Sequence, residues 1–358
     1  MRVEDLHSSP WSGVFYVTGG GVQLLANLTS VAGASNTVLA ASIPYSRRAL
    51  DTLIVDPNQG ACTSETAREL AFKAFKESRS QKLDDQVFGF GLSASLATNR
   101  VKKGELRAYI AVQTSSISQV SKVTFENFES RRDQEQYLSE VAWGKLCSAL
   151  YLDKDRFPEV STRKQQLATT LQPLYGAKAA YVGIKSTAFL SGSFNPLHTG
   201  HRNMRTHAQS RLDCEVQYEL CVSPFDKKPL DFFDLHDCMA QFEVDQLVLT
   251  NFSSFEEKSK HLSNGQAITF VVGVDTISRL ADPNYYTYSR VQTSETTMNE
   301  SIQKLHDRNV RFLVYGRNLG NRFVTLKDLE IPPLLTMLCE EVSEQEFRLD
   351  ITSTDLRL

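Results

Sequence analysis

Two histidines three positions apart are the side chains in this sequence whose types and spacing best suit chemistry. His198 and His201 end a loop that reads Gly-Ser-Phe-Asn-Pro-Leu-His-Thr-Gly-His over residues 192–201. A helical pattern begins near Gly200, and at a helix start this spacing can aim both imidazoles toward one point. The first turn of a helix also presents unpaired N–H groups and partial positive charge. The loop therefore predicts a site for polyphosphate, where Gly192 lets the backbone turn without obstructing a ligand.

Taken alone, a His-x-x-His pair is more typical of a metal site or of simple helix capping. Here the whole ten-residue string follows a buried, strand-like run that ends at Leu190 and leads into a helical pattern. This strand–loop–helix setting favours phosphate over metal, and we predict no metal held by protein ligands alone.

A second candidate phosphate motif reads Thr-Ser-Thr-Asp-Leu-Arg over residues 352–357. Ser353 and Thr354 can cap a helix and donate to phosphate oxygens. Arg357, one turn further, can reach the same anion through its planar guanidinium. By itself the segment is typical of an ordinary helix cap with an exposed arginine, and it gains meaning from its partner motif about 150 residues earlier.

Three shorter segments follow other strand-like runs. Lys227 and Lys228 follow residues 216–222 and could hold phosphates, although two solvated lysines are an alternative. Gly273 and Asp275 follow residues 268–272, where Asp275 could equally cap a helix. Arg317 follows residues 311–314, also at the end of a strand-like run.

The elements that must position these residues alternate between strands and helices. Expected strands in the second half cover 187–190, 216–222, 246–249, 268–272 and 311–314, and expected helices cover 200–211, 232–242, 276–280 and 296–306. Such alternation predicts an α/β fold with a doubly wound parallel sheet, Rossmann-like in character. Ligands in these sheets bind beyond the carboxyl ends of the strands, where all the candidate loops should lie.

The first half is a separate α/β pattern. Expected strands cover 13–17, 38–43, 86–93 and 106–114, and expected helices cover 22–28, 64–75 and 129–152. We assign residues 1–155 to a first domain, 156–184 to a connection with some helix near 164–171, and 185–358 to a second domain. A length of 358 residues suits two domains.

Bulk properties exclude several classes of function. A net charge of −3 gives no support for a nucleic-acid or membrane-surface partner, which would require a basic excess. Six cysteines without a C-x-x-C pair indicate reduced thiols. The start of the chain lacks the basic and apolar segments of a signal peptide, and no apolar run could span a membrane. The expectation is a cytoplasmic protein.

The second half resembles the nucleotidylyltransferase superfamily through His-Thr-Gly-His at 198–201 and Thr-Ser-Thr-Asp-Leu-Arg at 352–357. Lys-Lys-Pro-Leu at 227–230 and Gly-Val-Asp-Thr at 273–276 favour its nicotinamide/nicotinate mononucleotide adenylyltransferase branch. The resemblance implies transfer of AMP from ATP, with Mg²⁺, to a mononucleotide. The residues it implies for catalysis are His198, His201, Lys227, Lys228 and Arg357, and those for nucleotide binding are Gly192, Ser193, Phe194, Gly273, Asp275, Arg317, Ser353 and Thr354.

Residues 14–150 resemble the C-terminal, nicotinamide-nucleotide amidase domain of CinA. The match rests on Thr-Gly-Gly at 18–20, Leu-Thr-Ser-Val-Ala-Gly-Ala-Ser at 28–35, Tyr-Ser at 45–46 and Val-Asp-Pro at 55–57. However, Phe15 and Tyr16 stand where the family carries Glu and its nucleophilic Ser, and Leu50 stands where it carries Lys. Tyrosine is the weaker nucleophile here and leucine cannot activate a hydroxyl, so we expect an inactive domain.

Two further expectations follow from the CinA resemblance. The anion-binding arginine of the family is Arg131 or Arg132 in this sequence. CinA-type domains tend to oligomerise, so the resemblance also implies a homo-oligomer through this domain.

Three alternatives remain open at the level of sequence. One is a cytidylyltransferase or a related enzyme with another acceptor. The second is a nucleotide-binding regulatory protein without activity, which Asp237-Cys238 favours because relatives usually carry an arginine there. The third, an active amidase, is disfavoured by Tyr16 and Leu50.

Overall fold

The computed structural model describes most of the chain in two compact units. The residues described are 2–56, 58–82, 86–99, 104–125, 128, 130–152, 157–176, 178–224, 227–243, 245–286, 294–319 and 322–348. The first unit comprises residues 1–178 together with 227–235, and the second comprises 179–226 and 236–358. Both units are α/β, as the sequence predicts.

The first unit contains a mixed sheet with the strand order β2-β1-β3-β4-β5-β6. The strands are β1 Ser12–Thr18, β2 Val38–Ser42, β3 Val87–Ser95, β4 Arg107–Gln113, β5 Ile117–Thr124 and β6 Thr162–Gln166. β1 pairs in parallel with β2 and β3, whereas β4, β5 and β6 continue the sheet in antiparallel fashion. Every residue of β1 is buried because helices cover both faces of this sheet.

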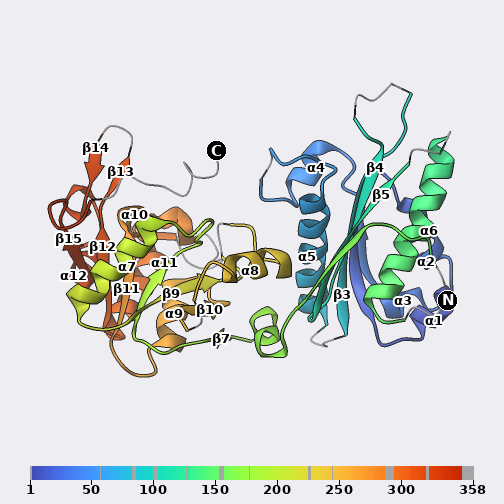
Figure 1. Ribbon diagram of the computed structural model, residues 1–358. Coiled ribbons are helices and arrows are strands. Elements are labelled where there is room, and N and C mark those ends of the chain that lie inside the picture. The colour runs from blue at the N-terminus through green and yellow to red at the C-terminus, as the bar shows by residue number, and fades with distance from the viewer. Residues whose placement is uncertain are drawn as a thin grey trace. The chain divides into compact units, whose positions relative to one another are not determined.

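Helix α5, Ser64–Gln81, covers one face of the first sheet, and α2, Val22–Thr29, with α6, Arg131–Ala149, covers the other (Figure 1). Thr63 starts α5, since its hydroxyl oxygen accepts from the Thr66 N–H at 3.1 Å. A Cβ at Gly91 would lie 2.2 Å from the Ala67 carbonyl oxygen, so glycine lets β3 approach α5 closely. Shorter elements are α1 Val3–His7, α3 Ala34–Thr37, α4 Arg47–Asp51 and the 3₁₀ turn η1 Thr169–Tyr175.

The helix expected near residues 164–171 is wrong for residues 164–166, whereas the 3₁₀ helix η1 begins at Thr169. Thr162–Gln166 forms edge strand β6, which pairs with β5 from Ser121↔Thr162 to Ile117↔Gln166. Residues 157–176 are therefore folded with the first unit, although we predicted them to be part of a connection.

The second unit contains a seven-stranded sheet with the order β15-β12-β11-β8-β9-β10-β7. Its strands are β7 Tyr181–Val182, β8 Ala188–Ser191, β9 Val216–Cys221, β10 Leu247–Thr250, β11 Ile268–Gly273, β12 Val310–Tyr315 and β15 Cys339–Val342. All neighbours are parallel except β7, which runs antiparallel to β10. From β8, the next strands along the chain, β9 and β10, are added on one side of the sheet. From β11, the later strands β12 and β15 are added on the other side. The switch point of this Rossmann-like sheet lies between β8 and β11.

Alternating residues of β9 show that helices cover both faces of the second sheet. Tyr218 packs against Arg205 of α7, Thr199–Leu212, whereas the next residue, Glu219, pairs with Lys258 of α9, Phe255–Leu262. Because successive side chains in a strand point to opposite faces, α7 and α9 lie on opposite sides. The sheet is therefore doubly wound, which confirms the predicted fold class.

The remaining elements complete the second half of the chain. They are α8 Phe232–Met239, α10 Val274–Leu280, η2 Pro283–Tyr286, α11 Ser294–Asp307, β13 Arg317–Leu319, β14 Arg322–Val324, η3 Leu326–Asp328 and α12 Pro333–Leu338. α11 and α12 contribute Ile302 and Leu335 to a core with Phe270 and Phe312 of the central strands.

Candidate functional site

The loop after β8 is held by the aromatic ring of Phe194. This ring is 1% exposed and lies edge-on to Tyr218 of β9 and to Phe242, with centroids 5.2 and 5.5 Å away. A Cβ at Gly192 would lie 2.8 Å from the Phe194 ring, so glycine leaves room for it. Gly192 and Ser193 are exposed above this anchor, while Phe194 faces the core. Phe194 thus supports the loop from beneath, and the first two residues form its outer surface.

Gln241 fixes the same loop through its side-chain amide. Its Oε1 accepts from the Leu197 N–H at 2.7 Å, and its Nε2 donates to the Phe194 carbonyl at 3.2 Å. One side chain therefore holds the backbone on both sides of residues 195 and 196. This arrangement fixes the approach of the loop to the start of α7.

His198 and His201 come together at the start of α7, as their spacing predicts. Their rings stack with centroids 3.8 Å apart and an interplanar angle of 27°. The backbone N–H of His198 donates to His201 Nδ1 at 3.4 Å. A neutral His201 therefore carries its proton on Nε2, where it can act as a hydrogen-bond donor.

Both imidazoles favour the neutral form. Burial lowers the pKa of His201 to about 4, and the neighbouring His198 contributes in the same direction. Burial also lowers the pKa of His198. Near pH 7 the pair consists of two uncharged rings, so it offers directed N–H donors instead of positive charge.

Several polar atoms around the histidines lack partners in the described part of the chain. Ser191 Oγ and His198 Nδ1 are buried and have no hydrogen-bond partner there. Within the same described residues, no acceptor is recorded for the N–H groups of Thr199 and Gly200, the first two residues of α7. Buried polar groups normally find partners, so this loop suits a polar ligand, and its N–H donors suit an anion.

The Gly273 segment lies beside the histidine loop at the switch point. β11 ends at Gly273 and pairs directly with β8, which ends at Ser191. Asp275 stands in the first turn of α10, and its Oδ2 lies 3.1 Å from Arg317 Nη1, with both side chains about a third exposed. Asp275 and Arg317 thus form one ion pair at the edge predicted to hold nucleotide.

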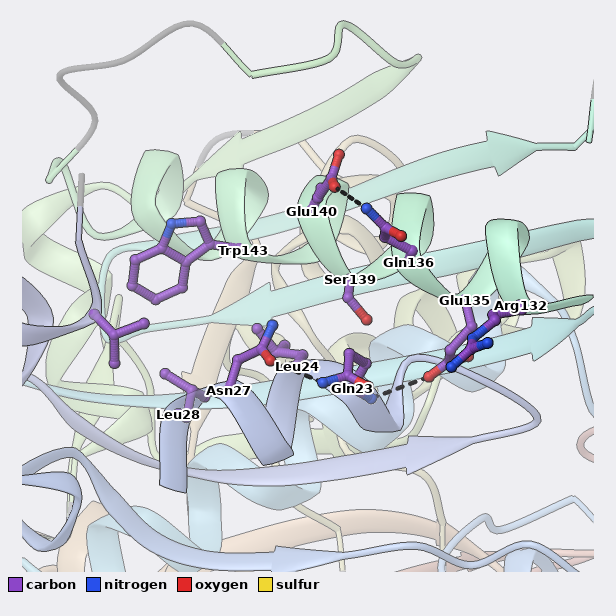
Figure 2. A pocket seen from close by; sticks show the side chains of 11 residues that line it. Gln23, Leu24, Asn27, Leu28, Arg132, Glu135, Gln136, Ser139, Glu140 and Trp143 are labelled. Atoms are coloured by element: carbon purple, nitrogen blue, oxygen red, sulfur yellow. Dashed lines mark hydrogen bonds between the residues drawn. The ribbon is translucent and has the colours of Figure 1, made fainter. Parts of the chain in front are cut away.

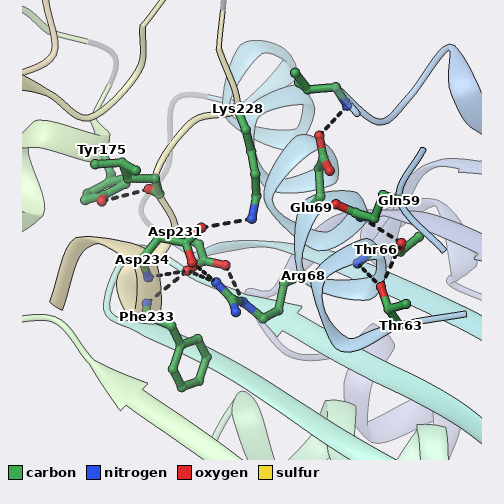
Figure 3. Close-up of polar contacts among 12 residues, drawn as sticks. Gln59, Thr63, Thr66, Arg68, Glu69, Tyr175, Lys228, Asp231, Phe233 and Asp234 are labelled. Atoms are coloured by element: carbon green, nitrogen blue, oxygen red, sulfur yellow. Dashed lines mark hydrogen bonds and ion pairs between the residues drawn. The ribbon is translucent and has the colours of Figure 1, made fainter. Parts of the chain in front are cut away.

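Lys228 belongs to the first unit, in the segment 227–235. Its Nζ lies 2.9 Å from Asp234 Oδ2, and Asp234 also contacts Arg68 of α5 (Figure 3). Arg68 forms a bidentate pair with Asp231, at 2.6 and 2.7 Å, and both partners are more than nine-tenths buried. Lys228 therefore has a carboxylate partner here, and a phosphate role for Lys227 and Lys228 stays a prediction.

The closing motif lies outside the described residues. This applies to Ser353, Thr354 and Arg357, whose predicted roles therefore stay predictions. Among the described residues, no group of three or more His, Cys, Asp or Glu side chains could hold a metal ion. None of the helices described combines the length and apolar character that a membrane span requires.

In the first unit, the positions of the expected amidase residues have structural partners. The Tyr16 hydroxyl donates to Glu77, and burial together with this carboxylate raises the pKa of Tyr16 well above its usual range. Leu50 is 2% exposed in a core cluster with Tyr16, Val14 and Leu70. Neither position therefore presents a reactive group.

In the first unit, side chains of α6 contact the glycine loop at residues 19–21, which joins β1 to α2. Glu135 of α6 accepts from the N–H groups of Gly21 and Gln23 at 2.7 and 3.0 Å. Arg131 donates to the Gly19 carbonyl at 3.1 Å and to the Tyr45 hydroxyl at 3.0 Å. A carboxylate thus occupies the N–H groups at the start of α2, and a guanidinium binds the loop before it.

Comparisons with known proteins find similarity to solved structures only. No protein-family model and no curated protein matches the chain. The competence/damage-inducible protein CihA from Agrobacterium tumefaciens is 16% identical, with a TM-score of 0.34, covering 42% of this chain and 90% of its own. CinA superfamily proteins from Enterobacter cloacae and Klebsiella pneumoniae are 15% and 13% identical, also at 0.34. They cover 40% and 42% of this chain and 85% and 94% of their own.

Two of these three proteins are named as members of the CinA superfamily. A similarity of this size supports no statement about what the chain does. The candidate site in the second unit therefore rests on its own geometry.

Three residues that organise these sites are absent from the sequence-based predictions. Gln241 contacts a loop more than 40 positions earlier, and Glu135 contacts a loop more than 110 positions earlier. Arg68 contacts Asp231 over 163 positions. Each is an ordinary polar residue within a helical pattern, and no local signal distinguishes it from a solvent-facing one.

Proposed function

We propose that the second unit transfers AMP from ATP to nicotinamide or nicotinate mononucleotide, giving the dinucleotide and pyrophosphate. One observation carries the proposal: the His198–His201 loop and the Gly273–Asp275 segment follow β8 and β11, the two strands that flank the switch point. Nucleotides bind doubly wound sheets at this location. The loop that leads into α7 also offers the donors that phosphate oxygens require.

The reaction is an attack by a phosphate oxygen of the mononucleotide on the α-phosphorus of ATP. The new P–O bond forms as the bond from the α-phosphorus to the bridging oxygen of pyrophosphate breaks. Negative charge on the phosphoryl oxygens must be stabilised in the transition state, and pre-positioned N–H donors do this without reorganisation. We assign that role to His201 Nε2–H and to His198, whose stacked rings hold each other in place.

The remaining predicted residues have supporting roles in this proposal. Asp275 and Arg317 contact the adenosine, while Ser353, Thr354 and Arg357 hold the β- and γ-phosphates. Bound Mg²⁺ would neutralise phosphate charge, and it usually keeps water and substrate oxygens as most of its ligands. The described residues fit this because the start of α7 offers N–H donors to phosphate oxygens.

Pyrophosphate release by the full-length protein tests the proposal. We expect release from ATP with Mg²⁺ and either pyridine mononucleotide, and none from CTP. His201→Ala should lower the rate about 100- to 1000-fold, the usual effect of removing one transition-state donor. His306→Ala, an exposed histidine of α11, is the matched control and should leave the rate unchanged.

Unchanged turnover in His201→Ala would refute the assignment. Release with CTP, or only with another acceptor, would support a related nucleotidyltransferase instead. Nucleotide binding without any release across the acceptor panel would favour a regulatory protein.

We further propose that the first unit has no amidase activity. The Tyr16 hydroxyl is already a donor to Glu77, and Leu50 is a core residue. Incubation with nicotinamide mononucleotide should therefore release no ammonia, and measurable release would contradict this assignment.

A further inference from the structure

The first unit contains a cavity that the expected amidase residues do not line. Its volume is about 500 Å³, and it lies between α2 and α6 (Figure 2). Arg132, Gln136, Ser139 and Trp143 recur along α6 at intervals of three or four residues, so they share one face of that helix. Neither Tyr16 nor Leu50 is among the lining residues. Pockets for small molecules usually have volumes of roughly 300–1,000 Å³, and this one falls within that range.

Ser139 marks this cavity as a polar site. Its side chain is 4% exposed, and Oγ has no hydrogen-bond partner in the described part of the chain. Figure 2 shows the hydroxyl extending from α6 toward α2. A hydroxyl withdrawn from water normally has a partner, so an unpartnered one in a cavity wall indicates a ligand atom or a water molecule.

The walls combine flat apolar surfaces with amide groups. Leu24 and Leu28 of α2 are buried side chains in the cavity wall, and Trp143 adds an aromatic ring from α6. Gln23 and Asn27 bond to each other at 2.9 Å. Each primary amide has two donor hydrogens and an acceptor oxygen, so both retain capacity for a ligand.

The charges around the cavity disfavour a polyanion. Among the described residues that line the cavity, Arg132 is the only cation, whereas Glu135 and Glu140 are both carboxylates. Glu135 is held in place by the N–H groups of Gly21 and Gln23. The net negative charge of the wall would repel a ligand with several phosphates, but it would not repel an uncharged molecule.

We propose that this cavity binds an uncharged, planar heterocycle with hydrogen-bonding edges: a nucleobase or its nucleoside. The ring packs against Trp143 and the leucines, the amides contact its polar edge, and the buried Ser139 hydroxyl supplies another hydrogen bond. This site is independent of the proposed transfer reaction in the second unit.

Fluorescence of Trp143 provides a direct test in the full-length protein. The chain has two tryptophans, so Trp11→Phe leaves Trp143 as the only reporter. We expect saturable quenching by at least one of adenosine, guanosine, cytidine and uridine, and weaker binding of the matching 5′-monophosphate. Because the signal comes from Trp143, nucleotide binding in the second unit does not account for it, and failure of the proposed transferase function leaves this result intact.

Variants of the buried Ser139 give the decisive comparison. Ser139→Ala should weaken binding about 2- to 12-fold, the usual net effect of one neutral hydrogen bond. Ser139→Leu should project three more carbon atoms into the cavity beside Ser139 and abolish saturable quenching. Ser80→Ala and Ser80→Leu, at an exposed serine of α5, are matched controls without effect. Asn27→Ala, at the exposed rim, should weaken binding without disturbing the core, and it keeps the test valid if Ser139→Leu does not fold.

Three outcomes would overturn the proposal. The first is the absence of saturable quenching by all four nucleosides. The second is wild-type affinity in Ser139→Leu, or in both Ser139→Ala and Asn27→Ala. The third is tighter binding of the monophosphate than of its nucleoside, which would indicate a phosphate site instead.

Discussion

The loops after β1 and β8 each contain glycine and join a buried strand to the first turn of a helix. They differ in the groups that lie against that first turn. In the first unit, Glu135 accepts from two N–H groups at the start of α2. In the second unit, the start of α7 has two stacked, neutral histidines and a buried His198 Nδ1 without a partner among the described residues. One helix start is closed by a side chain of its own unit, and the other retains donors for a ligand.

This difference shows that a glycine loop before a helix is insufficient evidence for an anion site. The favourable field of a helix start acts on any negative group, and a carboxylate on a neighbouring helix can satisfy it permanently. The same local sequence pattern can therefore bind a ligand or stabilise a fold, depending on a residue far away in the chain.

Gln241→Ala tests whether the loop after β8, called the open loop below, depends on its support. Among the three changes that compare the two loops, it has the largest expected effect. Removal of this amide leaves the Leu197 N–H and the Phe194 carbonyl without their partner, so the loop that leads to His198 should shift. Misplacement of catalytic groups by about 1 Å can cost about a hundredfold in rate. We expect kcat for pyrophosphate release to fall by about that factor.

The control for Gln241→Ala is Gln246→Ala, which removes only an exposed contact to Glu243. It should retain the wild-type kcat. Wild-type activity in Gln241→Ala would show that the loop is positioned without this side chain.

The two loops also show how far the sequence can predict such a structure. Strands β8, β9, β10, β11 and β12 are confirmed, and each is a short, mainly apolar run that is mostly buried. In β9 the polar Gln217 and Glu219 are buried as well. β6 was not predicted, since Thr-Arg-Lys-Gln-Gln has no apolar residue, and only its pairing with β5 makes it a strand. His198 and His201 are neighbours along a helix and could be paired from spacing alone. The contacts of Gln241 and Glu135 join distant segments, so they require the folded chain.

Glu135→Ala would break the closed loop and has an intermediate expected effect. The N–H groups of Gly21 and Gln23 lose a charged acceptor, which should lower the free energy of unfolding of the first unit by about 2 kcal/mol. Sulfate should then bind at the vacated helix start and raise the melting temperature of the variant more than that of the wild type. Thermal unfolding at several sulfate concentrations measures both effects.

Glu140→Ala serves as the control for this experiment, because Glu140 is an exposed carboxylate on the same helix that contacts only Gln136 among the described residues. Its sulfate response should equal that of the wild type. An equal response in Glu135→Ala would mean that the first loop cannot accept an anion even when its own carboxylate is removed.

The smallest expected effect concerns the pH dependence of the open loop. His201 has a pKa of about 4 in the folded protein because of burial and the adjacent His198, against an ordinary value near 6.5. As pH falls below 6.5, the unfolded chain therefore binds a proton at this position before the folded protein does. Folding stability contributed by the neutral imidazole is fully present above pH 6.5 and is lost progressively down to pH 4.

After allowance for partial exposure of the ring, the loss should be about 1–2 kcal/mol between pH 7 and pH 5. Many carboxylates also titrate at lower pH, so the measured quantity is the difference between wild type and His201→Gln in denaturant unfolding at each pH. Glutamine cannot titrate, and the difference should move in favour of the variant as pH falls. A constant difference across this range would mean that the imidazole is as readily protonated in the folded protein as in the unfolded chain, and that the open loop presents a charged pair instead of neutral donors.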